Sequence, residues 1–280
     1  MKLLRARTAG FCMGVDLALK KLSGLIGQEE PILTFGPIIH NPQVLAEYAA
    51  KGVRMVEDPA AIPTGATVVI RAHGIPEPVR EAILARGAKL VDATCPKVKK
   101  AQTLIASQAR HGKVLLLFGE AQHPEVRGLL SYARAGSHVF GSMAELATLD
   151  LPKGHIYFLA AQTTQDEQEF LRITKHLRHR FGQELTVLST ICNATANRQQ
   201  EAMELAGKVD FLVVVGGHSS GNTRRLAQVA ISAGTPCIHV ETADEIPREL
   251  LVGKRIIGLT AGASTPKTII DRVQTVLEAL

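Results

Sequence analysis

The sequence contains no tryptophan, and only 4% of its 280 residues are aromatic. A platform of aromatic side chains on which single-stranded nucleic acid could stack is therefore poorly supplied. The basic cluster at residues 175–180 is expected to be a solvated helix face. The composition thus argues against a nucleic-acid partner, although a net charge of +6 permits a small phosphorylated one.

Long hydrophobic runs are also missing. No stretch approaches the roughly 18 uncharged apolar residues that a membrane span requires, and the N-terminus lacks a long apolar signal core. We therefore predict a cytoplasmic protein with no membrane partner. The 46% apolar and 21% charged residues are typical of a globular chain and exclude a disordered or rod-like one.

The four cysteines form no Cys-x-x-Cys pair, which is the usual signature of a zinc knuckle. A disulfide framework is not expected in the cytosol. Cys237 lies in a β-prone segment and is predicted to be a buried core thiol. The other three lie at junctions between expected elements, where buried thiols, metal ligands and a nucleophile remain the alternatives: Cys12, Cys95 and Cys192.

One pattern repeats along the chain: a short β-prone run, a loop rich in glycine, proline and polar residues, and an amphipathic helical stretch. Short, continuously apolar strands are typical of parallel sheets covered by helices on both faces, so the pattern predicts an α/β fold. The six clearest strands begin at Pro31, Thr67, Val114, Ile156, Phe211 and Arg255.

The three junction cysteines divide the chain into thirds of similar length, and each third holds two of the repeated units. We therefore predict three small α/β domains in a pseudo-threefold trefoil, comprising residues 14–95, residues 96–191, and residues 192–280 together with 1–13. Ligands of open α/β sheets bind beyond the carboxyl ends of the strands. The polar loops of the three domains are thus expected to face one centre.

Three thiolates that come singly from distant segments suit a cuboidal [4Fe–4S] cluster better than a zinc ion. The fourth iron of such a cluster would lack a protein thiolate and would be open to a substrate. Three unrelated buried thiols are the alternative that the spacing leaves open.

The loops around these positions contain eight blocks that together resemble one protein family over nearly the whole chain. The blocks are Gly-Phe-Cys12-Met-Gly-Val, Ile-Ile-His40-Asn, Ala-His73-Gly, Asp-Ala-Thr-Cys95-Pro, His123-Pro-Glu125-Val, Gln-Thr163-Thr, Ile-Cys192-Asn-Ala-Thr-Ala-Asn-Arg-Gln and Thr-Ala-Gly-Ala-Ser264. In these blocks the sequence is similar to the LytB or IspH family, the 4-hydroxy-3-methylbut-2-enyl diphosphate reductases of the methylerythritol phosphate route to isoprenoids.

The resemblance implies a trefoil of α/β domains around one [4Fe–4S] cluster per chain, held by Cys12, Cys95 and Cys192 with one open iron. It implies reductive removal of the C4 hydroxyl of the allylic diphosphate, using two electrons and two protons. The open iron would act as a Lewis acid toward the C4 oxygen. The products would be isopentenyl and dimethylallyl diphosphate and water, and the electron donor a ferredoxin or flavodoxin.

The resemblance also implies roles for single residues. Glu125, beside His123, would be the general acid, and Thr163 would position the reacting oxygen or relay a proton. From the residues alone, the favoured interpretation of Glu125 is an ordinary first-turn acidic residue that complements the helix dipole. A diphosphate out of water needs several hydrogen-bond donors. The residues implied to bind it are His40, His73, His123, Thr163, Ser220, Gly221, Asn222 and Ser264.

The chain departs from the family pattern in its phosphate loop, which usually reads Asn-Ser-Ser-Asn. Here the loop reads Ser219-Ser220-Gly221-Asn222, so a hydroxyl donor is missing at Gly221. The Gly221 N–H or His218 is expected to substitute, with altered affinity. Arg71 and Ala161 are also less usual and bear on substrate scope more than on the fold.

Two other functions remain as alternatives. One is a different three-cysteine cluster enzyme that resembles quinolinate synthase and catalyses a dehydration. The other is a redox-sensing or nucleotide-binding protein with residues 216–222 as its phosphate loop, although these glycines match no common nucleotide motif. The remaining histidines are expected to have surface or packing roles: His111, His138, His155, His176, His179 and His239.

Overall fold

The computed structural model describes residues 1–280, and its strands form three four-stranded sheets in which every pairing is parallel. All three sheets share one strand order. The first strand of each sheet lies between the second and the third strand, and the fourth strand lies at the edge beyond the third. In the third sheet the fourth place is taken by β1 (Lys2–Arg5), so the N-terminal strand completes a sheet of the C-terminal part.

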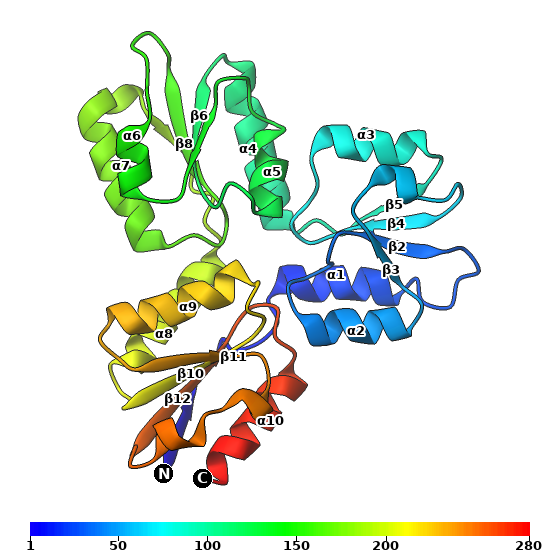
Figure 1. Ribbon diagram of the computed structural model, residues 1–280. Helices are drawn as coiled ribbons and strands as arrows, with labels where there is room; N and C mark the ends of the chain where they lie inside the picture. The colour runs from blue at the N-terminus through cyan, green and yellow to red at the C-terminus, as the bar shows by residue number, and fades with distance from the viewer. The chain divides into compact units, whose positions relative to one another are not determined.

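The elements fall into three sets (Figure 1). The first set contains α1 (Met13–Ser23), β2 (Ile32–Phe35), α2 (Pro42–Ala50), β3 (Arg54–Val56), β4 (Thr67–Ile70), α3 (Glu77–Ala85) and β5 (Lys89–Asp92). The second set contains α4 (Pro96–Arg110), β6 (Val114–Phe118), α5 (Pro124–Leu130), β7 (His138–Phe140), α6 (Met143–Thr148), β8 (Tyr157–Ala161), α7 (Glu167–Phe181) and β9 (Thr186–Val187). The third set contains β1, α8 (Asn193–Ala206), β10 (Phe211–Val215), α9 (Gly221–Ser232), β11 (Cys237–Val240), β12 (Ile256–Ala261) and α10 (Lys267–Glu278).

The chain forms two compact units. The first unit comprises residues 1–16, 39–47 and 193–280 and contains the sheet of β1, β10, β11 and β12. The second unit comprises residues 17–38 and 48–192 and contains the other two sheets. The sheets lie within the three ranges predicted from the cysteine spacing, and the boundaries of those domains stay a prediction.

Both faces of each sheet are covered, and the inner strands are accordingly buried at nearly every position. In β10, Val213 belongs to a core shared with α10, while Leu212 and Val214 belong to a core shared with α8 and α9. Figure 1 shows α8 and α9 on one face of this sheet and α10 on the other. In the second set, α7 covers one face of the β6–β8 pair and α4 and α5 cover the other. The layered α/β arrangement predicted from the sequence is therefore present.

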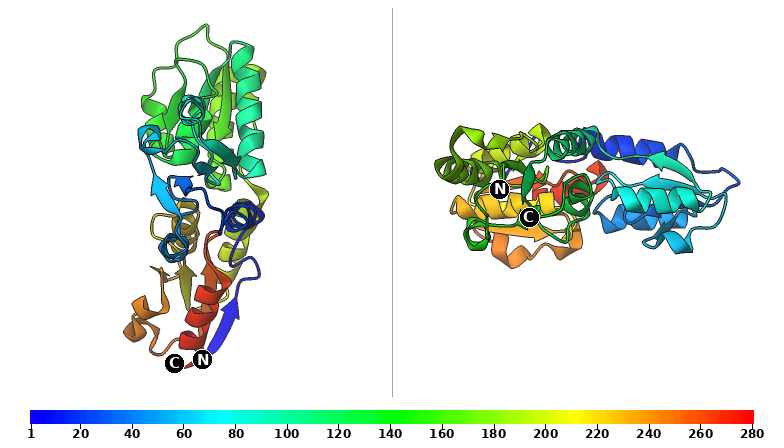
Figure 2. Two further views of the ribbon diagram at one scale, coloured as in Figure 1. Left: turned by 90° about the vertical axis from the view of Figure 1, so that its right-hand side faces the viewer. Right: turned by 90° about the horizontal axis from the view of Figure 1, so that it is seen from above.

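Prolines mark the helix starts. Pro42, Pro96 and Pro124 are the first residues of α2, α4 and α5, where the fixed φ suits the first turn and the missing N–H has no partner to lose. No helix of the structure combines the length and the apolar character that crossing a membrane demands. The two termini lie at the same end of the first unit's sheet, where β1 pairs with β12 and α10 ends (Figure 2).

Cys237 is the first residue of the edge strand β11 and is only half-buried, whereas the sequence predicted a core thiol in a buried strand. It nevertheless contacts the core beneath α8 and α9. Burial raises the pKa of its thiol to about 11, which keeps it protonated and unreactive near neutral pH.

Candidate functional site

Each predicted site residue follows a strand at its carboxyl end. Because the strands of each sheet are parallel, the loops of one sheet emerge at one edge. The second unit holds His73 after β4, Cys95 after β5, His123 and Glu125 after β6, Thr163 after β8 and Cys192 after β9. The first unit holds Cys12 after β1, Ser220, Gly221 and Asn222 after β10, Ser264 after β12, and His40.

The three junction cysteines share one backbone geometry. Each directly precedes a helix, namely α1, α4 or α8. The N–H of Cys95 donates to the carbonyl of Ala72 at 2.9 Å, and Ala72 is the second residue after β4. Equivalent bonds join Cys12 to Ala263 after β12 at 3.1 Å and Cys192 to Thr163 after β8 at 2.9 Å.

This donor set fits an iron–sulfur cluster. None of the three cysteines forms a disulfide, and all three are partly exposed. Each lies where a helix begins, and the positive end of a helix suits the negative charge of a thiolate-bound cluster. Cys237 is also partly exposed, but it begins an edge strand and does not precede a helix.

In the second unit the rings of His73 and His123 meet edge to face, with centroids 5.4 Å apart. His123 is 8% exposed and caps α5, because its Nδ1 accepts the Glu125 N–H at 3.2 Å. The neutral ring therefore carries its proton on Nε2. This tautomer presents His123 as a hydrogen-bond donor.

Glu125 and Thr163 form a buried pair. The Thr163 N–H donates to Glu125 Oε1 at 2.6 Å, and the Thr163 hydroxyl donates to Oε2 at 2.9 Å. Glu125 is 1% exposed, and burial raises its pKa to about 7 even though both bonds from Thr163 act to lower it. A carboxyl group with this pKa can hold and release a proton near neutral pH. Because the Thr163 carbonyl also accepts the Cys192 N–H, this pair is joined to the Cys192 loop.

In the first unit the loops after β10 and β12 meet the segment of His40. The Ser264 hydroxyl donates to the His40 carbonyl at 3.0 Å. Gly217 also lies against this carbonyl, since a Cβ at Gly217 would be 2.6 Å from the oxygen. The His40 segment is thus held between the two loops.

The phosphate loop ends at the N-terminus of α9. Ser220 caps this helix, its hydroxyl accepting the Thr223 N–H at 3.3 Å, and Gly221 is the first helical residue. Asn222 is 6% exposed, yet neither polar atom of its side chain has a hydrogen-bond partner. Buried polar atoms without partners are rare, and a helix N-terminus favours an anion. This end of α9 therefore suits a phosphate group.

His218 lies in the same loop but is directed elsewhere. Its ring is 4.5 Å from that of His239, and its Nε2 is 3.5 Å from Glu245. The exposed position beside an acidic residue does not suggest an anion ligand. His239, in turn, meets the Gly216 carbonyl at 2.7 Å through its Nε2 and so contacts the start of the loop.

Comparison with known proteins decides the family. Residues 3–278 match the family described as LytB protein. The chain belongs to this family. It is 74% identical to the 4-hydroxy-3-methylbut-2-enyl diphosphate reductase of Solidesulfovibrio magneticus over all of both chains. It is 41% identical to the enzyme of that name from Geobacter sulfurreducens, with 98% of this chain and 95% of the relative covered.

Two solved reductase structures have folds similar to that of this chain. The E-1-hydroxy-2-methyl-but-2-enyl-4-diphosphate reductase of Plasmodium falciparum matches with a TM-score of 0.94 at 27% identity, covering 99% of this chain and 87% of that one. A second structure, titled as the terminal enzyme of the non-mevalonate pathway, matches at 0.68 and 36% identity over all of both chains. The fold class and the family resemblance predicted from the sequence are confirmed, and the quinolinate-synthase-like and nucleotide-binding alternatives lose their support.

Residues that hold the cysteine loops of this LytB protein were not found from the sequence. On α8, Arg198 donates to the Gly10 carbonyl at 2.8 Å and to the Ala194 carbonyl at 3.0 Å, and it is 6% exposed. One turn later, Glu201 accepts both the Arg7 and Thr8 N–H groups at 2.8 Å. These two side chains fix the loop that leads into Cys12.

The other two cysteine loops are held by different groups. Asp92 Oδ1 accepts the Thr94 N–H at 2.9 Å, next to Cys95. The Thr190 hydroxyl both accepts the Ala161 N–H at 2.8 Å and donates to the Ala161 carbonyl at 2.7 Å, two residues before Cys192. Only the local Asx-type pattern at Asp92 is visible in a sequence, because the other contacts join distant segments.

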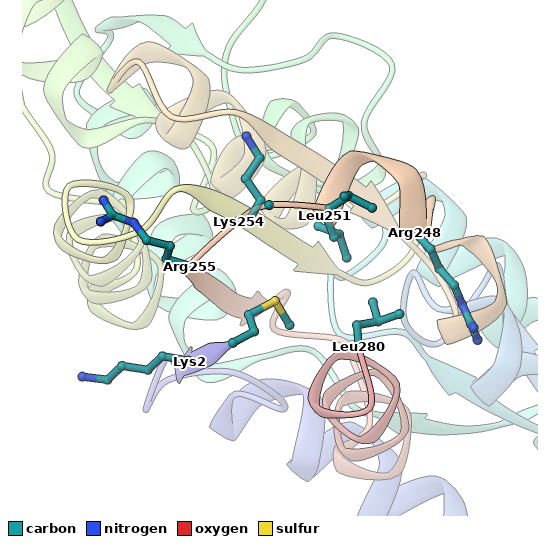
Figure 3. A pocket seen from close by; sticks show the side chains of 9 residues that line it. Lys2, Arg248, Leu251, Lys254, Arg255 and Leu280 are labelled. Atoms are coloured by element: carbon teal, nitrogen blue, oxygen red, sulfur yellow. The ribbon is translucent and has the colours of Figure 1, made fainter.

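A cavity of about 730 Å³ opens at the opposite end of the first unit's sheet (Figure 3). Lys2, Lys254 and Arg255, at the amino ends of β1 and β12, line it together with Arg248 and Leu280. It contains none of the predicted site residues. The predicted site residues of this LytB chain lie instead beyond the carboxyl ends of the strands.

Proposed function

We propose that this chain reduces 4-hydroxy-3-methylbut-2-enyl diphosphate to isopentenyl and dimethylallyl diphosphate. In this reaction the C4–O bond breaks, a C–H bond forms, and the hydroxyl leaves as water at the expense of two electrons and two protons. The buried Glu125–Thr163 pair carries the proposal, because it is a proton donor with a pKa of about 7 in a chain that matches the reductase family over residues 3–278.

Cys12, Cys95 and Cys192 are the proposed ligands of one [4Fe–4S] cluster. When bound, this group supplies an open iron that acts as a Lewis acid and a path by which electrons reach the substrate. Support comes from the positions of these three cysteines, each of which directly precedes a helix and none of which forms a disulfide. The cysteines themselves donate no proton in this scheme.

The diphosphate is the proposed ligand of the polar groups at the carboxyl ends of the strands. The unpartnered amide of Asn222, the Ser220 cap and the Gly221 N–H at the start of α9 suit a phosphate. Donors without fixed charge give direction to the bonds, and imidazole rings can donate in either charge state. The other proposed ligands are His40, His73, His123, Thr163 and Ser264.

Glu125 holds the proton that the leaving hydroxyl needs. In its protonated form the Oε2–H faces the Thr163 hydroxyl, which can accept this proton and pass its own onward. The Thr163 N–H keeps Oε1 in place during the exchange. His123, whose Nδ1 binds the Glu125 N–H, fixes the start of α5 and offers Nε2–H to the substrate. Electrons would come from a ferredoxin or flavodoxin, and the cytoplasmic location stays a prediction.

The proposal is tested by anaerobic reconstitution with iron and sulfide, addition of the allylic diphosphate and a reduced viologen dye, and identification of the products. We expect dye oxidation that yields both five-carbon diphosphates and slows as the pH rises above 7, because Glu125 must be protonated. Glu125→Gln should lower the rate by about 10²–10⁴-fold. The control Glu77→Gln removes an exposed first-turn carboxylate from α3. A loaded cluster without dye oxidation would overturn the proposal.

A further inference from the structure

The first residues of α4 carry an unusual charge. Lys97, Lys99 and Lys100 lie two to five residues after Cys95, all three are exposed, and the first turn of the helix contains no acidic residue. The N-terminus of a helix carries positive partial charge, so lysines are disfavoured there. Lys99 has a partner in Asp92 at 2.6 Å, whereas Lys97 and Lys100 have no ion pair. A local arrangement that opposes helix stability is commonly a functional one.

A second helix brings more lysines to the same loop. Lys21 of α1 donates to the Asp92 carbonyl at 2.6 Å, on the residue whose carboxylate binds Lys99. Lys20 is its exposed neighbour. Leu17, 38% exposed, lies one turn earlier on the same side of α1. We call these six residues of the second unit the lysine patch: Leu17, Lys20, Lys21, Lys97, Lys99 and Lys100.

The patch keeps a strong positive charge after its acidic neighbours are counted. Asp92 accepts bonds from both Lys21 and Lys99, and Asp16 is an acidic residue on α1. The patch thus has five lysines against these two acidic residues, and the positive end of α4 adds to the same field. A surface of this sign attracts acidic proteins and speeds their association.

We propose that the lysine patch is the docking site of an acidic one-electron carrier protein. This inference rests on the proposed function, in which Cys95 is a cluster ligand and two electrons are needed. Electron transfer slows steeply with distance, and the patch begins at Lys97, two residues after Cys95. Two reduced carriers would dock in turn, each would be oxidised by one electron, and Leu17 would supply an apolar contact within the charged surface.

The test compares two double variants that change the net charge equally. Lys97→Glu with Lys100→Glu reverses the patch, and acidic residues suit this helix start, so folding is not at risk. Lys175→Glu with Arg178→Glu reverses two exposed residues of α7. We expect the KM for reduced carrier to rise about tenfold in the patch variant only, with a weaker salt dependence. The viologen-driven rate should stay within about twofold of the wild type.

Ferredoxin and flavodoxin are assayed as separate carriers, and a rise in KM for one of them supports the proposal and identifies the donor class. An equal rise in both double variants would overturn it, because net charge alone would then explain the effect. Loss of the viologen-driven rate with an unchanged carrier KM would also overturn it. Calorimetric binding of each carrier needs no turnover, so a patch-specific loss of affinity supports the docking site even where the proposed reaction fails.

Discussion

Glu125 shows how one buried position can be set for acid chemistry. Its carboxyl group accepts two hydrogen bonds from Thr163, which favour the charged form, and it is removed from water, which opposes that form more strongly. The pKa of about 7 is the balance of these two effects. Glu77 occupies a similar position in the first turn of α3, but its side chain is exposed to water.

This balance predicts a dependence of stability on pH. The pKa of Glu125 is raised from 4.5 in the unfolded chain to about 7 in the folded one, so its contribution is complete below pH 4.5 and is lost as the pH rises to 7. The loss amounts to about 3 kcal/mol. We therefore expect apo Glu125→Gln to melt at a higher temperature than the apo wild type at pH 8 and at a similar temperature at pH 5. Calorimetry at both pH values checks this, and a lower melting temperature at pH 8 would contradict it.

Gly221 is the residue at which this chain differs from the usual phosphate loop. It begins α9 and does not have a positive φ, so a serine fits the backbone there. Gly221→Ser adds a hydroxyl at the proposed phosphate site, and a hydrogen bond to a charged group should lower the KM for the diphosphate by about tenfold. An unchanged KM in the viologen assay would mean that the backbone N–H already fills this role.

At the scale of elements, the inner strands were predictable and the edge strands were not. All six segments recognised from their apolar runs became the inner pairs, such as β6 and β8, where every residue is buried. Edge strands are short and partly exposed, as in β3 (Arg54–Val56) and β9 (Thr186–Val187), so their sequences lack a clear apolar signal. Only the segment at Cys237 was recognised among them.

The helix α8 holds the loop of Cys12 through Arg198 and Glu201, and this arrangement predicts an effect on the cluster. Arg198→Met removes both bonds to the Gly10 and Ala194 carbonyls, so we expect iron to be lost to a chelator about tenfold faster. Arg198→Lys should restore part of the loss, since one carbonyl can still be bound. Arg172→Met on the exposed face of α7 is the control. Equal rates in all four proteins, the wild type included, would show that the loop needs no such support.

At the scale of the whole molecule, the site could be predicted because its residues lie in short motifs at strand ends. The contacts that give these residues their properties could not be predicted. The bonds between Glu125 and Thr163 join loops of two different strands, and His218, expected as a substitute phosphate ligand, instead contacts Glu245 and His239. Such partners depend on packing that a motif does not record.

The three-cysteine assignment makes a prediction for the whole chain. We expect Cys12→Ser, Cys95→Ser and Cys192→Ser each to leave the reconstituted protein with little iron and sulfide. Cys237→Ser should keep the wild-type iron and sulfide content, because the Cys237 thiol stays protonated. An incompletely ligated cluster is also expected to bleach in air and to lose activity. Full iron content in any of the first three variants would contradict the assignment.

The most direct measurement of the central claim is Mössbauer spectroscopy of the enzyme reconstituted with isotopically enriched iron, recorded before and after addition of the allylic diphosphate. The account predicts that the signal of one iron in four changes when the substrate binds, while the signals of the three thiolate-bound irons stay the same. A spectrum in which no iron responds, or in which all four respond alike, would contradict a substrate site at one open iron.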